Sequence, residues 1–431
     1  MTNYGISRRL RWVFFFLLSM GSTANADEAL RLDFLDAGLI ALRQHPSLLI
    51  RADGVLAAQH ELEEANWQRF PAASVDIGTA LAQQSEGSST VDKQGMTLRI
   101  QQPLWSAGRI DAEVDGARVR HALAEIDKRQ AEQDVLLRVV EIYSEHQRWQ
   151  ARLAIADENL TEHRRLLALI NRRSEQKISS QADLSLANAR LQQALAEQQS
   201  FRLSAQKLLS NMQQLLGLAG QPLRFAPLEA ITLPDEALPV LLESARQASP
   251  RLARLLAEGD LARAEAAVRS AQRYPQLFMR YEKMTGSAKT VASDRLMLAL
   301  EYQPGAGLGS WSAAEAAARR VAMADGGVAL GERELHDRLA DVFSEWKTYA
   351  EQKSTANDYA QAARGVMASY MRQFTAGRKT WQEVLNAQRE LAQAAYSAID
   401  AAHGEILASH RLAVLTGLLT PGYLMQKKHT P

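Results

Sequence analysis

A glycine-rich run is the first part of the sequence that could support chemistry. Gly305, Gly307 and Gly309 alternate with other residues, as they would in a phosphate-binding loop. A dinucleotide-binding fingerprint would need a further glycine where Ser310 stands, and Pro304 precedes the run. We therefore interpret the run as a flexible exit from a strand into a helix.

Acid–base and metal chemistry find no suitable set of residues. Glu141 and Glu145 share a predicted helix face with His146, but charged residues at this spacing ordinarily form a solvated face. The 9 histidines show no zincin spacing or clustered ligand set, and no serine-hydrolase motif occurs. The absence of cysteine excludes disulfides, thiolate metal sites and cysteine nucleophiles. We predict no enzyme, no cofactor and no metal site.

The longest regular pattern runs from Trp105 to Gly217. It has no proline, and its apolar residues recur at helical spacing, as at Leu136, Val139, Val140 and Tyr143. Residues 176–180 lack the apolar stripe, so we predict two antiparallel helices joined there. A helix from Trp105 to Arg173 would be ~100 Å long, which suits an element that bridges a distance.

Four stretches alternate with a period of two residues, which is typical of strands. Val75, Ile77, Thr79 and Leu81 share one face. Met96, Leu98 and Ile100 alternate with Thr97, Arg99 and Gln101, and we expect Pro103 to end this strand. The second half repeats the pattern with Leu277, Met279 and Tyr281, and then with Leu296, Leu298 and Leu300. We expect the apolar faces to contact lipid.

The strand length carries a further consequence. About ten alternating residues is the length of a tilted transmembrane strand. Lipid does not tolerate open sheet edges, and four strands are too few to close a barrel. Several copies of the chain must then contribute, and three copies would supply twelve strands. The alternative is a small soluble sheet that caps a helical bundle.

The sequence contains two related halves. Residues 68–71 (QRFP) match 272–275 (QRYP), and Tyr143-Ser144-Glu145 matches Phe343-Ser344-Glu345. We predict a first repeat at 27–221, a proline-rich linker at 222–247, a second repeat at 248–422 and a polar tail at 423–431.

The first 26 residues have the features of a secretory signal peptide. Three arginines precede an apolar run at 12–20, and Ala24-Asn25-Ala26 is a typical cleavage site. The run is shorter than the ~20 residues needed to span a bilayer. With a formal net charge of only +1, we expect no nucleic-acid partner.

In this layout the chain resembles the TolC family of outer-membrane efflux and secretion proteins. The motifs are QPLWSAG at 102–108, and GRKT at 377–380 leading into EVLNA at 383–387. The resemblance implies a mixed α/β membrane protein in the outer membrane that extends into the periplasm. It would be a homotrimer with a transmembrane β-barrel of four strands per chain and a long antiparallel α-helical coiled-coil barrel.

The resemblance also implies site residues at the tip of the helices. Asp183, Lys379, Glu383 and Asn386 match positions that close the tunnel near the trimer axis, as a periplasmic gate. The alternative is that the two acids are helix N-terminal residues favoured by the helix dipole. A second set would dock an adaptor protein, and its residues are Gln373, Phe374, Gly377 and Arg378.

The function implied is an exit duct that works with a periplasmic adaptor (membrane fusion) protein and an inner-membrane transporter of the ABC type. The segments EYQPGAGLG at 301–309 and AGRKTWQEVLNAQRE at 376–390 favour type I secretion of a large adhesin-like protein. Drug or metal efflux by the same fold is the alternative. A periplasmic structural coiled-coil protein without a pore is the alternative from another class.

Overall fold

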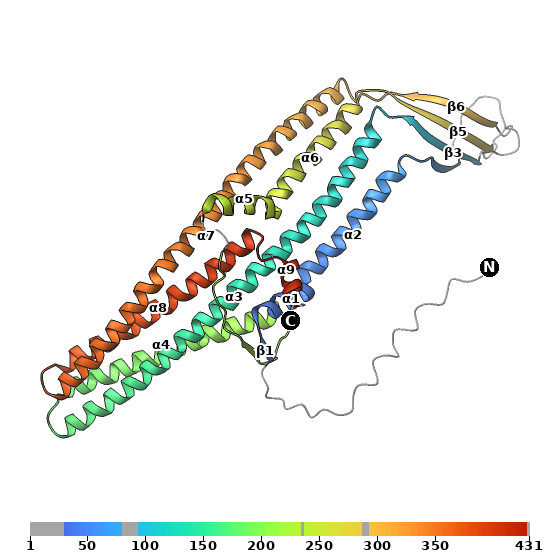
Figure 1. The fold of residues 1–431 in the computed structure, drawn as a ribbon. Coiled ribbons are helices and arrows are strands. Elements are labelled where there is room, and N and C mark those ends of the chain that lie inside the picture. The colour runs from blue at the N-terminus through green and yellow to red at the C-terminus, as the bar shows by residue number, and fades with distance from the viewer. Residues whose placement is uncertain (1–29, 80–93, 234–236, 287–292, 429–431) are drawn as a thin grey trace, which may run out of the picture.

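The computed structural model describes residues 30–79, 94–233, 237–286 and 293–428. In these ranges the molecule is a long helical bundle. A β-sheet lies at one end, and the turns that connect the long helices lie at the other (Figure 1). Among the described helices, none has an apolar stretch sufficient to cross a bilayer. The predicted signal peptide and Leu81 lie outside the described residues.

The two halves of the chain contain helices of matching length in the same order. α1 (Phe34–Gln44) and α5 (Leu238–Ala248) each have 11 residues, and α2 (Pro46–Trp67) and α6 (Pro250–Ala271) each have 22. α3 (Arg109–Glu175) and α7 (Gly309–Thr375) each have 67 residues, and α4 (Gln181–Leu215) and α8 (Trp381–Leu415) each have 35. These equal lengths are the structural counterpart of the sequence repeat.

The long helices form two antiparallel hairpins. α3 packs along α4, and α7 packs along α8. At 1.5 Å per residue, α3 and α7 are each ~100 Å long. The turn expected at 176–180 is confirmed, because α3 ends at Glu175 and α4 begins at Gln181. Toward the sheet, α2 and α6 take the place of the shorter helices beside α3 and α7.

The sheet has four antiparallel strands. They are β2 (Ala72–Thr79), β3 (Gln94–Trp105), β5 (Gln276–Gly286) and β6 (Ser293–Glu301), in the order β2-β3-β5-β6. The pairing of β3 with β5 joins the hairpins of the two halves. β2 and β6 are the edges, and nothing in the described part of this chain pairs with their outer sides.

Pro103 does not end its strand, contrary to the prediction. β3 continues to Trp105, with a shift of register between Pro103 and Trp105. β2 begins at Ala72, opposite Gln101, so β3 has no β2 partner from Gln102 onward. A proline is tolerated on such a free edge because its missing N–H costs no ladder hydrogen bond.

A core in the middle of the molecule fixes two short peripheral segments of the chain to the long helix α3. β1 (Leu30–Leu32) pairs in parallel with β4 (Leu223–Phe225). Fully buried Tyr143 of α3 donates its hydroxyl to the carbonyl oxygens of Leu32 at 3.2 Å and Ala226 at 2.7 Å. These bonds fix β1, at the start of the first half, and the segment after β4, at its end, to α3.

Two segments contain more structure than expected. The stretch at 222–247, predicted as a linker, contains β4 and most of α5. The stretch from residue 423, predicted as a polar tail, belongs to α9 (Pro421–Lys428) as far as it is described. Leu424 of α9 is fully buried and lies where a Cβ on Gly38 would meet it at 3.1 Å. Leu424 is part of the apolar core that includes α1 and α3.

Buried histidines make the helical core sensitive to acid. Burial lowers the pKa of His163, His403 and His410, and lowers that of His146 from 6.5 to about 4. The Nδ1 atom of His146 is buried without a hydrogen-bond partner, and its ring lies edge-on to Phe225 at 4.8 Å. The folded state therefore holds a neutral imidazole that becomes protonated only with difficulty.

We predict that His146→Phe reduces the acid sensitivity of the fold. Because the folded pKa lies below the unfolded one, the stability contribution is complete above about pH 6.5 and is lost as the pH falls toward 4. The whole gap corresponds to roughly 3 kcal/mol. The apparent melting temperature should fall less between about pH 7.5 and pH 5 in His146→Phe than in the wild type. Exposed His60→Phe is the control, and an unchanged fall in His146→Phe would contradict the assignment.

Candidate functional site

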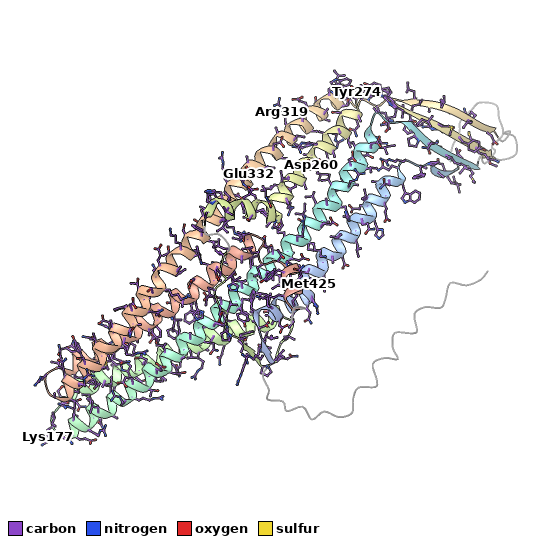
Figure 2. All side chains as sticks on the ribbon, in the orientation of Figure 1. Lys177, Asp260, Tyr274, Arg319, Glu332 and Met425 are labelled. Atoms are coloured by element: carbon purple, nitrogen blue, oxygen red, sulfur yellow. The ribbon has the colours of Figure 1, made fainter. Side chains whose placement is uncertain are left out.

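The two turns between the long helices lie close together at the end of the molecule opposite the sheet, where Lys177 is labelled (Figure 2). Their backbones follow one pattern. The Lys177 amide donates to the Ser174 carbonyl at 2.9 Å, and the Gly377 amide donates to the Phe374 carbonyl at 3.0 Å. Lys177 has φ 61° and Gly377 has φ 75°. The first turn thus places a lysine in the left-handed conformation that glycine adopts without strain.

Each turn leads into a capping box at the start of the next helix. In α4 the Ser180 amide donates to the Asp183 carboxylate at 3.1 Å, and the Asp183 amide donates to the Ser180 hydroxyl at 3.1 Å. In α8 the Thr380 amide donates to Glu383 at 2.8 Å, and the Glu383 amide donates back at 3.4 Å. Asp183 and Glu383 therefore stabilise the first turns of their helices. Both acids thus lie in the first turn of a helix, as the alternative to the gate role supposed.

Lys379 adds a charge pair in the second copy. Its ammonium donates to the Glu383 carboxylate at 2.6 Å and lies 4.4 Å from the centre of the Tyr370 ring. The hydrogen bonds from Lys379 and Thr380 lower the pKa of Glu383 to about 2, and the bond to Glu383 raises the pKa of Lys379. The pair is charged throughout the physiological pH range.

The structure brings together some of the expected gate residues. Lys379 and Glu383 are bonded, and Asn386 is exposed one helical turn beyond Glu383 on the same face of α8. Asp183 instead bonds to Ser180 of its own helix. Within a single chain, the first-copy acid and the second-copy residues remain separate features of neighbouring hairpins.

Phe374, expected among the docking residues, is enclosed within the chain. Its side chain is only 5% exposed and packs against Trp381 with ring centres 5.5 Å apart. The Arg173 guanidinium of α3 lies 4.8 Å from the Phe374 ring, so this core joins the two hairpins. Of the other expected docking residues, Gly377 and Arg378 are exposed, and Gln373 is half-buried. Neither Trp381 nor Arg173 was predicted as part of this site. The apolar pattern of α8 could have indicated that Trp381 is buried.

The sheet at the other end has one apolar face. Strand pairing places Ala73, Ile100, Tyr281 and Leu296 in one row across the four strands. The neighbouring rows on this face contain Val75, Ile77, Met279, Leu298 and Leu300, and these five side chains are between 41% and 78% exposed. Exposed apolar side chains in continuous rows mark a surface that contacts lipid or protein. Met96, Leu98 and Ile100 share this face as predicted, but Lys283 and Asp294 also lie on it, in the row of Val75 and Leu98.

The opposite face carries a row of ion pairs. Arg99 of β3 lies 3.6 Å from Asp76 of β2 and 3.0 Å from Glu282 of β5, and Arg295 of β6 lies 3.8 Å from Glu282. In a second row Arg280 bonds to Gln101 at 2.9 Å and also to Glu301. The alternation along β3 predicted that Arg99 lies on the polar face of the sheet. Its ion pairs with Asp76 and Glu282 of the neighbouring strands were not predicted.

Comparison with known proteins gives a consistent result. The model of the outer membrane efflux protein family matches residues 40–218, a span that begins within α1 and ends just past α4. The comparison with curated proteins finds no match. Among solved structures, CusC shares 16% identity with a TM-score of 0.80, covering 89% of this chain and 91% of that one. Its description concerns folding and transmembrane channel formation.

Two further solved structures are similar to this chain in fold to about the same degree. The outer membrane protein VceC from Vibrio cholerae shares 17% identity with a TM-score of 0.77, covering 89% of this chain and 96% of that one. The CmeC outer membrane channel from Campylobacter jejuni shares 12% identity with a TM-score of 0.78, covering 89% and 85%. At these identities the likeness establishes the fold.

The family model, which covers less than half of the chain, and the shared fold both support the resemblance to TolC-like outer-membrane efflux proteins. The family consists of channel proteins and not enzymes.

Lys177 and Gly377 provide a matched test of the tip geometry. We predict that Lys177→Gly strengthens its turn by up to about 1 kcal/mol, because the left-handed cost of a side chain exceeds the added unfolded-state entropy of glycine. Gly377→Ala should weaken the other turn by about 1 kcal/mol. Amide hydrogen exchange measures both effects, at Ile178 and Arg378, whose amides close the turns. Faster exchange at Ile178 in Lys177→Gly would contradict this account.

Proposed function

We propose that the protein is the outer-membrane exit duct of a three-component export machine. The observation that carries the proposal is the sheet at the end of ~100 Å helices, which exposes a largely apolar face between two edges that are unpaired within the described residues. In lipid each edge must find a partner strand. A homotrimer supplies the partners, and its four strands per chain form a transmembrane β-barrel.

The remaining parts follow from this arrangement. The helical hairpins form an antiparallel coiled-coil barrel that extends from the outer membrane into the periplasm. Residues 1–26 are a signal peptide, 27–221 and 248–422 are the two repeats, 222–247 joins them, and 423–431 ends the chain. The charged row of the sheet faces the lumen and its apolar face contacts outer-membrane lipid.

The tip is the periplasmic gate in this proposal. Lys379, Glu383 and Asn386 lie on one face of α8, and Asp183 occupies the corresponding start of α4. Near a threefold axis these groups would interact between copies and favour a closed state. Exposed Gly377 and Arg378, with half-buried Gln373, form the contact for the periplasmic adaptor protein, which links the duct to an inner-membrane transporter of the ABC type.

We propose type I secretion of a large adhesin-like protein as the transport function. Its support is the resemblance of residues 301–309 and 376–390 to family members of that kind. Deletion of the chain should stop export of the adhesin without reducing its synthesis, measured by surface labelling and whole-cell immunoblotting. An adhesin that still reaches the surface, together with raised drug or metal sensitivity, would replace this function with small-molecule efflux.

The lipid face is tested by arginine at neighbouring positions of β3. Ile100 lies between uncharged Ala73 and Tyr281, and Thr97 lies on the other face beside Asp76. Ile100→Arg should destabilise the assembled barrel by up to roughly 2–4 kcal/mol, while Thr97→Arg costs little. The measurement is the yield of heat-resistant trimer in outer-membrane fractions. Equal trimer yields for the two variants would refute the lipid-facing assignment, and absence of wild-type trimer from this fraction would favour a structural coiled-coil protein.

The gate is tested by removing charge while keeping the helix caps. We predict that Asp183→Asn combined with Glu383→Gln raises single-channel conductance in a planar bilayer, because the network between copies loses its acids. Glutamine at this position still forms a capping box. The control combines Ser180→Ala with Thr380→Ala, which removes cap hydroxyls and keeps the charges. Unchanged or lower conductance in the folded charge variant would remove these acids from the gate.

A further inference from the structure

The charged row of the sheet alternates in sign from one edge to the other. Arg99 of β3, Glu282 of β5 and Arg295 of β6 lie in register, and Asp76 of β2 lies diagonally to Arg99, whose register partner is Ser74. Each neighbouring charged pair is within 3.8 Å. The Glu282 side chain is only 15% exposed, whereas Asp76 is 64% and Arg295 is 59% exposed. The inner members have charged partners on both sides, and among the described residues the outer members have such a partner on one side.

The two open ends of the row are complementary. β2 ends the row with an acid and β6 ends it with a base, on the two edges that have no partner strand in the described part of the chain. Opposite charges on adjacent strands stabilise their pairing, and like charges directly opposite destabilise it. A second copy of the chain, placed with its β2 beside this β6, would continue the same alternation.

We propose that Arg295 of one copy pairs with Asp76 of the next copy, so that the row closes into a ring of alternating charge. This inference rests on the proposed homotrimer and adds the register in which its strands meet. The ring contains equal numbers of acids and bases, so it orders the barrel wall without giving the lumen a net charge at this level.

Registers that place Asp76 more than two residues from the position opposite Arg295 leave the charges unmatched, since Arg99 already reaches Asp76 at an offset of two residues. Asp76 is the only charged residue in β2 (Ala72–Thr79). On the same face of β6 the charged residues are Arg295 and Glu301, and Glu301 is an acid already bonded to Arg280. Asp294 pairs in register with Lys283 and lies on the opposite face. Arg295 is therefore the one basic group that β6 offers to Asp76.

The absence of cysteine makes this register directly measurable. Within one copy, β2 and β6 are three strand spacings apart, or ~14 Å. A disulfide needs Cα atoms within about 7 Å. A disulfide between positions 76 and 295 can therefore form only between copies.

The experiment uses the full chain with Asp76→Cys and Arg295→Cys, oxidised in outer-membrane vesicles and analysed on a denaturing gel without reductant. We expect covalent trimers. The first control pairs Arg295→Cys with Ile77→Cys, which lies on the opposite face, and the second pairs it with Ser74→Cys, two residues along the same face. Both controls should form less than about a tenth of the cross-linked product, since geometry limits the disulfide.

A charge-based measurement supports the same assignment without cysteine. Asp76→Asn and Arg295→Gln should each lower the temperature at which the trimer dissociates, and the double variant should lower it by less than the sum of the two. Additive effects, or preferential cross-linking of either control pair in an intact trimer, would overturn the register and leave the duct in place. A wild-type protein that forms no trimer would overturn both proposals.

Discussion

The unpaired edges of the sheet are the constraint on which the rest of the structure depends. β2 and β6 each present a row of backbone N–H and C=O groups with no partner in the described chain. In water such edges can be solvated, but this sheet also exposes an apolar face that favours lipid. In lipid an unpaired backbone group costs several kcal/mol. A single chain cannot satisfy both demands in lipid, and this is the physical ground for the proposed assembly.

The long helices connect the sheet to the opposite end of the molecule. α3 and α7 start directly after the sheet and run to the opposite end of the molecule (Figure 1). Between these ends, the middle core fixes β1, β4 and α9 against α3 through Tyr143 and Leu424. A shift at the tip is thus a shift of rigid helices whose other ends are fixed in the sheet. Such an arrangement is compatible with the gate and the barrel proposed above.

Asp183 and Glu383 cap their helices, in addition to the gate role proposed for them. Asp183 and Glu383 are needed where they are because four N–H groups at each helix start lack helical partners. Their capping bonds hold the carboxylates in defined positions, and Lys379 gives only the second copy an additional charge pair. The core of Phe374, Trp381 and Arg173 keeps the two hairpins in contact. The duplicated halves have therefore kept one backbone geometry while acquiring different surface charge.

The sequence alone determined the elements and their order. Helical spacing of apolar residues, alternation in the strands, and the turns at 176–180 and 376–380 depend on local periodicity and capping, which single segments express. The sorting of Met96 and Ile100 to one sheet face and Arg99 to the other also follows from alternation. The short strand β4, the buried position of Leu424 and the passage of β3 through Pro103 were not predicted, because they depend on neighbours distant in the chain.

Only the tertiary structure decided which charged groups meet. Nothing local to Arg99 indicates that Asp76 and Glu282 are its partners, since Glu282 is 183 residues away and arrives through the pairing of β3 with β5. In the same way, the apolar pattern did not show that Phe374 is enclosed by Trp381 and by Arg173 of the other hairpin. Local sequence specifies which face a residue occupies, whereas contact between faces is set by packing that joins the two halves.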